Sequence, residues 1–196
     1  VGNYNVLRAA GNRGIKRVAL ASTDSTLGFA FNKNKPDPEY LPVDEKHPLK
    51  PDNSYGISKV LAEKVADGMA QRFPEMSIVS LRIPYVADPD EDYKKGSSFS
   101  KWLKDPEEGP WNLWSYIDNR DSARAFKIAL ETEFDGHEIF FVTADNTRSV
   151  IPTRDLIDKY FPGVKFKKNI DKYGSLEDTT KAKEMLGFKP RYRWDD

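Results

Sequence analysis

Tyr55 and Lys59 stand four residues apart, a spacing that places two side chains on one face of a helix. A free tyrosine has a pKa of about 10 and is a poor base at neutral pH, whereas a nearby ammonium group favours its ionised form. The pair therefore has the chemistry of a general acid or base. The alternative is a solvated surface pair, because nine tyrosines among many lysines produce such a spacing by chance.

Three polar residues, Ser22, Thr23 and Asp24, stand at the end of an apolar run at residues 17–22 that is typical of a buried parallel strand. In open α/β sheets the carboxyl ends of the strands form the ligand crevice, so hydroxyl groups here can hydrogen-bond a substrate oxygen. The alternative role of these residues is to cap and turn the chain, as Ser, Thr and Asp commonly do after a strand.

A helix is predicted directly after these groups. Residues 55–72 repeat an apolar residue every four positions, which indicates a helix with one apolar face and a cap at Asn53 or Ser54. The repeated residues are Ile57, Leu61, Val65 and Met69.

In the rest of the chain, predicted strands and predicted helices continue to alternate. Apolar runs at 77–86 and 138–144 predict two more strands, and helices are expected at about 120–131, from Thr153 onward, and before Gly187. The chain opens on the end of an amphipathic helix, with Val1, Val6, Leu7 and Ala10 on one side. This order predicts the α/β class with a parallel sheet.

Composition narrows the choice of partners. Thirty-one basic and thirty-one acidic residues cancel, so neither nucleic acid nor a membrane surface is expected as a partner, and a small molecule is favoured. The lack of cysteine excludes disulfides, and with only His47 and His137 no metal site is expected. No apolar run approaches the roughly 18 residues of a membrane span, which favours a cytoplasmic protein.

The order of these parts resembles the extended short-chain dehydrogenase/reductases, in their epimerase/dehydratase branch. The segments that carry the resemblance are RVALASTDSTLG, PVDEKHPLKPDNSYGISKVLAEKVA, VSLRIPYV, WSYIDNRDSARAF and LGFKPRY. In that family a strand ends in hydroxyl residues, an acidic loop with proline follows, and YxxxK opens the next long helix. The resemblance covers essentially the whole chain and implies the C-terminal part of a Rossmann-like sheet with a small α/β substrate-binding lobe.

Two parts are expected on this basis. Residues 1–88 would form the catalytic part of the Rossmann-like domain without its Gly-rich N-terminal half. Residues 89–196 would return to the sheet and form a small C-terminal substrate lobe. The family's cofactor fingerprint, GxxGxxG after a strand, is absent, because Gly11 and Gly14 follow a helix and the next position is Arg17. We therefore expect an N-terminally truncated chain that is inactive alone and prone to aggregate along the edge at residues 17–22.

The resemblance also implies roles for single residues. Tyr55 would be the catalytic acid/base, Lys59 would promote its ionisation and hold the nicotinamide ribose, and Thr23 would position the substrate oxygen. The implied cofactor is NAD, with NADP not excluded, and it would carry the hydride. The cofactor-binding residues would be Tyr55, Lys59, Ser22, Pro84, Tyr85 and Val86, although the last three also fit an ordinary strand-ending turn.

The expected substrate is a sugar or sugar acid. The lobe is short for a nucleotide-linked sugar, and the loop DPDEDYKKGSSFSKWL resembles the segment of uronate dehydrogenases in which a basic residue meets a sugar carboxylate. Lys94 and Lys95, with Thr23 and Asp24, are therefore predicted to bind substrate. A nucleotide-sugar epimerase or dehydratase is the alternative.

Other residues leave their roles open. Arg148 and Arg154 are candidates for a substrate anion or for surface arginines near a helix start, and Asp121 is predicted to cap a helix. The tryptophans at 102, 111 and 114 are expected in the core rather than stacked on a sugar.

A function of another class is a non-catalytic module that senses the cofactor or binds a protein. The presence of Tyr55, Lys59 and Thr23 together argues against it. The family resemblance also implies a possible homodimer through the helix with YxxxK.

Overall fold

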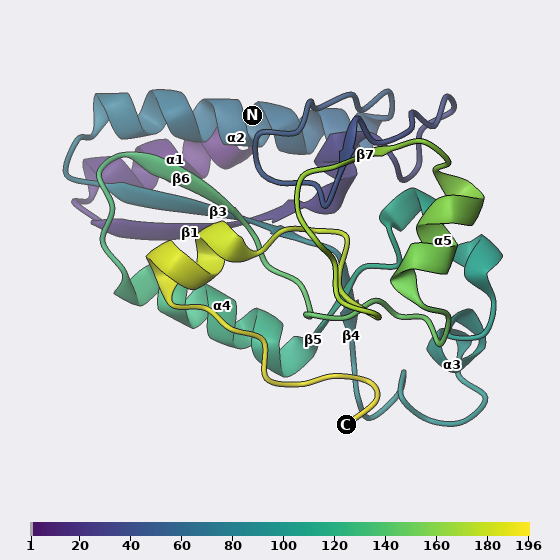
Figure 1. Cartoon of the computed structure of the whole chain (residues 1–196). Coiled ribbons are helices and arrows are strands. Elements are labelled where there is room, and N and C mark those ends of the chain that lie inside the picture. The colour runs from purple at the N-terminus through teal and green to yellow at the C-terminus, as the bar shows by residue number, and fades with distance from the viewer. Residues whose placement is uncertain (1) are drawn as a thin grey trace.

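The computed structural model describes residues 2–196, so Val1, predicted on the apolar side of the first helix, lies outside the described residues. Its centre is a three-stranded parallel sheet in the order β1 (Arg17–Thr23), β3 (Ser77–Ile83), β6 (His137–Phe141) (Figure 1). The predicted α/β class and parallel sheet are confirmed. The run at 77–86 is divided at Pro84, which has no N–H for a strand ladder, into β3 and the short β4 (Tyr85–Ala87).

Helices cover both faces of this sheet (Figure 1). On one face lie α1 (Gly2–Asn12) and α2 (Ser54–Arg72), and on the other lie α4 (Asn119–Glu131) and a π-helical turn at Ala182–Leu186. The first face buries Leu7, Ala66, Met69 and Ile78, and the second buries Val79, Leu81, Ala125, Phe140 and Leu186. Neighbouring strand residues enter opposite clusters because side chains alternate across a strand.

Helix α2 begins as predicted, but only the later part of its predicted apolar face, at Val65 and Met69, packs into the core. The Asn53 side chain accepts a hydrogen bond from the Gly56 N–H at 2.8 Å and caps the helix. The apolar repeat faces solvent at its start, since Ile57 is 42% and Leu61 is 59% exposed. The buried side carries Gly56, Glu63, Ala66, Met69 and Ala70. Its small residues allow close packing against the sheet, so periodicity identified the helix but identified its inner face only at the C-terminal half.

Helix α4 corrects a second expectation. Its N-cap is Asp118, whose Oδ1 accepts a hydrogen bond from the Arg120 N–H at 2.9 Å. Asp121, predicted as the cap, is fully buried in the first turn and accepts hydrogen bonds from the backbone N–H groups of Arg191 and Tyr192. Asp121 therefore holds the C-terminal segment against α4 instead of starting the helix.

A small lobe stands beyond the carboxyl ends of the sheet strands (Figure 1). It contains β2 (Tyr40–Leu41) paired with β7 (Lys165–Phe166), β4 paired with β5 (Tyr116–Asp118), and the helices α3 (Ser98–Trp102) and α5 (Thr153–Tyr160). Its core is rich in aromatic side chains, including the fully buried Trp114, as expected for the tryptophans. Residues after 88 build most of this lobe. They also return to the sheet, which β6 joins and α4 covers on one face.

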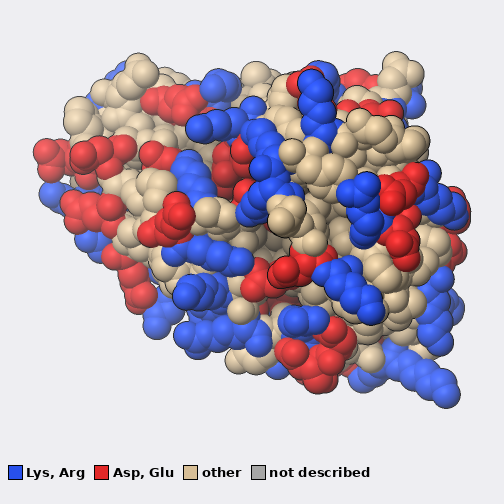
Figure 2. All heavy atoms as spheres, in the orientation of Figure 1, with Lys and Arg blue, Asp and Glu red and all other residues tan. Residues whose placement is uncertain are grey.

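The surface is mixed in charge. Figure 2 shows Lys and Arg side chains interspersed with Asp and Glu over the visible face, in keeping with the net charge of zero. Of the helices described, none is both long enough and apolar enough to cross a membrane.

Candidate active site

The loop that follows β1 presents the hydroxyl groups predicted to bind substrate. Thr23 Oγ1 accepts a hydrogen bond from the Ser25 N–H at 3.2 Å and so caps a short 3-10 turn at Asp24–Leu27. Gly28 ends the turn with φ at 86°, and a Cβ at this position would stand 2.2 Å from the Lys50 carbonyl oxygen. Thr23 therefore caps the turn and also lines a cavity, whereas its role toward a substrate oxygen stays a prediction.

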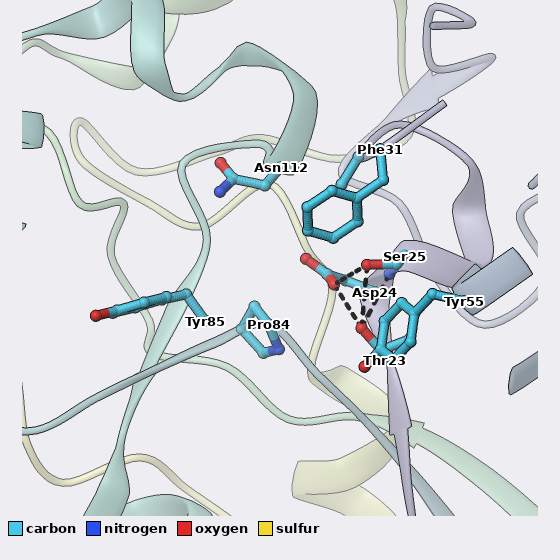
Figure 3. Close-up of a pocket in the computed structure, with 9 residues that line it drawn as sticks. Thr23, Asp24, Ser25, Phe31, Tyr55, Pro84, Tyr85 and Asn112 are labelled. Carbon is cyan, nitrogen blue, oxygen red and sulfur yellow. Dashed lines mark hydrogen bonds between the residues drawn. The ribbon is translucent and has the colours of Figure 1, made fainter. Parts of the chain in front are cut away.

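That cavity lies at the carboxyl ends of β1 and β3 and has a volume of about 480 Å³ (Figure 3). Five residues predicted from the sequence or the family resemblance line it: Thr23, Asp24, Tyr55, Pro84 and Tyr85. Ser25, Ala30, Phe31 and Asn112 complete the wall. Residues from a strand end, a helix start and two loops thus meet around one space, at the position where open α/β sheets bind ligands.

Tyr55 stands in the first turn of α2, and its side chain remains accessible, at 46% exposed. The Lys59 ammonium lies 5.6 Å from the centre of the Tyr55 ring, as the four-residue spacing predicts, and donates a hydrogen bond to the Ala21 carbonyl at 2.8 Å. This bond ties α2 to β1 two residues before Thr23. The lysine therefore fixes the helix that carries Tyr55 relative to the strand that carries Thr23.

Ser22 faces away from this cavity. Its hydroxyl donates a 2.6 Å hydrogen bond to Glu63, and Glu63 forms a bidentate ion pair with Arg82 through bonds of 2.9 and 2.8 Å. All three side chains are buried. Because successive strand residues point to opposite sides, Ser22 supports the floor beneath the site while Thr23 lines it.

Asp24 is the acidic group of the cavity. Its carboxylate accepts hydrogen bonds from Thr23 and Ser25, at 3.0 and 3.4 Å. Burial raises the pKa of Asp24 to about 6, and these hydrogen bonds only partly oppose the shift. Burial also raises the pKa of Glu177, with the Asp24 charge as a second cause, so the two carboxyl groups disfavour each other's ionised form.

Besides Ser22 and Lys59, which act from behind the wall, three further predicted site residues stand outside the lining of this cavity. Val86 is 39% exposed on β4, Lys95 is exposed, and Lys94 pairs with Glu91 at 3.2 Å on the surface. Their predicted roles remain predictions from the sequence. Conversely, the sequence does not predict Phe31 and Asn112, because Phe31 lies in a loop and Asn112 ends a single 3-10 turn at Pro110–Asn112, and neither segment has a periodic pattern. The Asn-rich and Pro-rich composition around them signals only a turn.

A hydrogen-bonded Ser–His–Asp chain occurs elsewhere in the molecule. Ser80 Oγ lies 2.8 Å from His137 Nε2, and His137 Nδ1 lies 2.7 Å from Asp67 Oδ1. Ser80 is only 1% exposed, so its hydroxyl is closed to substrate and the chain joins β3, β6 and α2. Across residues 2–196 no group of three or more His, Cys, Asp or Glu side chains is arranged to hold a metal ion.

Comparison with known proteins gives the same family as the motifs. The profile of the NAD dependent epimerase/dehydratase family matches residues 1–142. Uronate dehydrogenase of Pseudomonas putida is 29% identical over 148 residues, which is 74% of this chain and 45% of that protein. UDP-glucose 4-epimerase of Lactobacillus helveticus is 26% identical over 204 residues, covering 97% of this chain and 55% of that protein. The chain thus spans about half the length of these curated relatives.

Solved structures support the fold. A short-chain dehydrogenase/reductase superfamily protein from Agrobacterium tumefaciens, crystallised with bound NAD, superposes with a TM-score of 0.69 at 21% identity. The match covers 99% of this chain and 68% of that one. The sheet, the Tyr55–Lys59 helix and the family profile lead to one assignment: the chain belongs to the NAD-dependent epimerase/dehydratase family.

Proposed function

We propose that this protein transfers a hydride between NAD and a hydroxyl or carbonyl carbon of a sugar or sugar acid. The observation that carries the proposal is the meeting of Thr23 and Tyr55, from two different elements, on the wall of one cavity. In the oxidative direction Tyr55 takes the proton of the substrate hydroxyl while the Thr23 hydroxyl holds the same oxygen. When bound, NAD supplies the acceptor for the hydride that leaves the adjacent carbon.

The residues present fit the nicotinamide end of the cofactor. Lys59 uses one of its three N–H donors on the Ala21 carbonyl, and the other two remain for ribose hydroxyls. Pro84 and Tyr85 line the same cavity as Tyr55 and contribute apolar atoms to its wall for the ring. Since the sequence contains no GxxGxxG, we assign only this end of the cofactor site to these residues.

Dehydrogenation of a sugar or sugar acid is the favoured reaction, supported by the similarity to uronate dehydrogenases. Epimerisation is the second candidate, because the UDP-glucose 4-epimerase similarity extends over 97% of the chain. The two reactions differ in their products: a dehydrogenase accumulates NADH from NAD, whereas an epimerase returns the hydride to its substrate.

The experiment that tests the role of Tyr55 is its replacement by phenylalanine. In a form of the protein that binds NAD and turns over, we expect Tyr55→Phe to lower kcat for NADH formation by roughly 100-fold or more, because the proton acceptor is lost, with little change in NAD affinity. Tyr173→Phe, at a surface tyrosine, is the matched control and should retain full turnover. Undiminished turnover in Tyr55→Phe would show that another group moves the proton.

We also propose that the protein forms a homodimer through α2. Ile57 and Leu61 expose apolar side chains on this helix, and such a face is stabilised by a second copy. Light scattering after gel filtration should give twice the chain mass for the wild type, and Leu61→Glu should lower it to the monomer. A wild-type monomer at high concentration would rule this out.

A further inference from the structure

Arg148 is buried behind the cavity with unused hydrogen-bonding capacity. Its side chain is 2% exposed, and among residues 2–196 neither Nε nor Nη1 has a hydrogen-bond partner. These two nitrogens carry three of the five N–H donors of a guanidinium group. Only Nη2 is engaged, by the Glu108 carbonyl at 2.9 Å and by Asn112 Oδ1 at 3.2 Å. Buried donors are normally satisfied, so an arginine that served only to join two loops would use more of them.

Arg148 also has no ion-pair partner among residues 2–196. Arg82, Arg120 and Arg124 each pair with a carboxylate, whereas Arg148 forms no ion pair within the described residues. Burial lowers the pKa of Arg148 to about 10, and the Glu108 charge opposes this only in part, so the group stays charged at neutral pH. A cation–π contact, 4.8 Å from the guanidinium carbon to the centre of the Trp102 ring, holds it in place. A buried charge without a partner is costly, and a bound anion would offset that cost.

Asn112 connects this charge to the cavity. Its Oδ1 accepts from Arg148, which fixes the amide so that Nδ2, a donor, is left for the cavity that Asn112 lines. Figure 3 shows the Asn112 nitrogen on the side of Pro84 and Tyr85 and its oxygen turned away. The hydroxyl and carboxyl groups of Thr23, Ser25 and Asp24 gather at a separate part of the wall. The cavity therefore has an acid/base end and a donor end backed by positive charge.

We propose that Asn112 binds the carboxylate of a sugar acid in this cavity, and that Arg148 positions Asn112 and supplies the charge that favours the acid over a neutral sugar. This inference rests on the proposed function. An acidic sugar fits the division of the cavity, because its carboxylate and its reacting hydroxyl lie at different ends of one small molecule. Asn112 makes the contact, and Arg148 acts through it.

The test is the ratio of two affinities, measured by calorimetric titration of D-glucuronate and D-glucose into the protein in the presence of NAD. The wild type should prefer glucuronate by about tenfold or more, the usual strength of one charge-assisted hydrogen bond. Arg148→Met and Asn112→Ala should each bring the ratio close to one, and Asn112→Asp should invert it by placing a second carboxylate there. Arg154→Met is the matched control, since Arg154 is an exposed arginine paired with Asp158, and its ratio should equal that of the wild type.

The outcomes separate this inference from the proposed function. Equal affinity of the wild type for both sugars, or an unchanged preference in Asn112→Ala, would overturn the inference alone. Binding of neither sugar would overturn the proposed function as well. If Arg148→Met fails to fold, Asn112→Ala and Asn112→Asp decide the question, because Asn112 is only partly buried and its replacement leaves the core intact.

Discussion

Ser22 and Thr23 are adjacent residues with opposite environments. Thr23 lines the cavity, while Ser22 bonds to Glu63 in a buried network that includes Arg82. The network is attached to the chain at Ser22, the residue next to Thr23. Breaking it should therefore lower the free energy of unfolding, and it should affect the site only through that loss.

Removing one partner of this buried ion pair should therefore be costly. Glu63→Gln leaves the Arg82 charge buried and unpaired, and we expect a loss of about 3–5 kcal/mol in the free energy of unfolding, measured by urea denaturation. Lys64→Ala, which breaks the neighbouring exposed pair with Asp67, should change it by less than about 1 kcal/mol. Similar losses in the two variants would mean that the buried pair is not a structural support.

Asp24 predicts a pH dependence of stability. Its folded pKa is raised to about 6 from 3.8, so the folded state binds the proton more tightly than the unfolded state. The resulting stabilisation is complete below pH 3.8 and is lost as the pH rises through about 6. Asp24→Asn should therefore gain stability relative to the wild type between pH 4 and pH 7, by an amount of order 2–3 kcal/mol. Thermal unfolding of both proteins across this pH range measures the difference, and parallel curves would contradict it.

The residues of the site differ in how far sequence reasoning can find them. Thr23 and Tyr55 lie at a strand end and a helix start, where the pattern of apolar residues changes and capping residues mark the boundary. Asn112, at the end of a 3-10 turn, and Arg148, in a loop, are 36 positions apart along the chain. Only folding brings them together, and neither segment has a periodicity that records the contact.

Helix α2 contains two glycines, Gly56 and Gly68, and only Gly56 is closely packed against its surroundings. A Cβ on Gly56 would stand 2.7 Å from the Pro51 side chain and 2.8 Å from the Ser25 carbonyl oxygen, which belongs to the turn beside Thr23. Gly68, in the same helix, has nothing within 4 Å. The helix start is thus packed directly on the loop of the site, whereas its later part has room.

This asymmetry gives a matched pair of variants. Gly68→Ala should stabilise the protein by up to about 1 kcal/mol, because alanine is the better helix former. Gly56→Ala should destabilise it by roughly 1–3 kcal/mol through overpacking and should lower turnover by displacing Ser25. Chemical denaturation and NADH formation measure the two effects. An equal gain in stability from both substitutions would contradict the close packing at Gly56.

For α2, the sequence pattern predicts that a helix forms but only in part which of its residues are buried. The four-residue apolar repeat predicts the helix correctly, but Ile57 and Leu61 end outside because Ala66 and Ala70 permit the closest approach to the sheet. Glu63 is inside because Arg82, nineteen positions later on β3, pairs with it. A hydropathy pattern contains no information about such a partner.

In the central sheet of the molecule, β1 lies at one edge of the part that residues 2–196 form. Within the described residues it pairs only with β3, while β3 is paired on both sides. Alternate residues of a strand in a parallel sheet direct their N–H groups to opposite neighbours. We therefore expect hydrogen exchange to alternate between slow and fast along β1 and to be uniformly slow along β3. Uniform protection of β1 would show that its outer edge is covered in solution.

The register of the sheet has a consequence for how the protein is made. Arg17 faces Ser77 and Ile78 faces His137, so each pairing joins residues about sixty positions apart, and such distant contacts form slowly. At the usual pace of ~5–20 residues per second, β6 leaves the ribosome several seconds after β1. A nascent chain that ends before Phe141 therefore has its helices but an incomplete sheet. The protein must keep its apolar strands from associating with others until β6 has been synthesised.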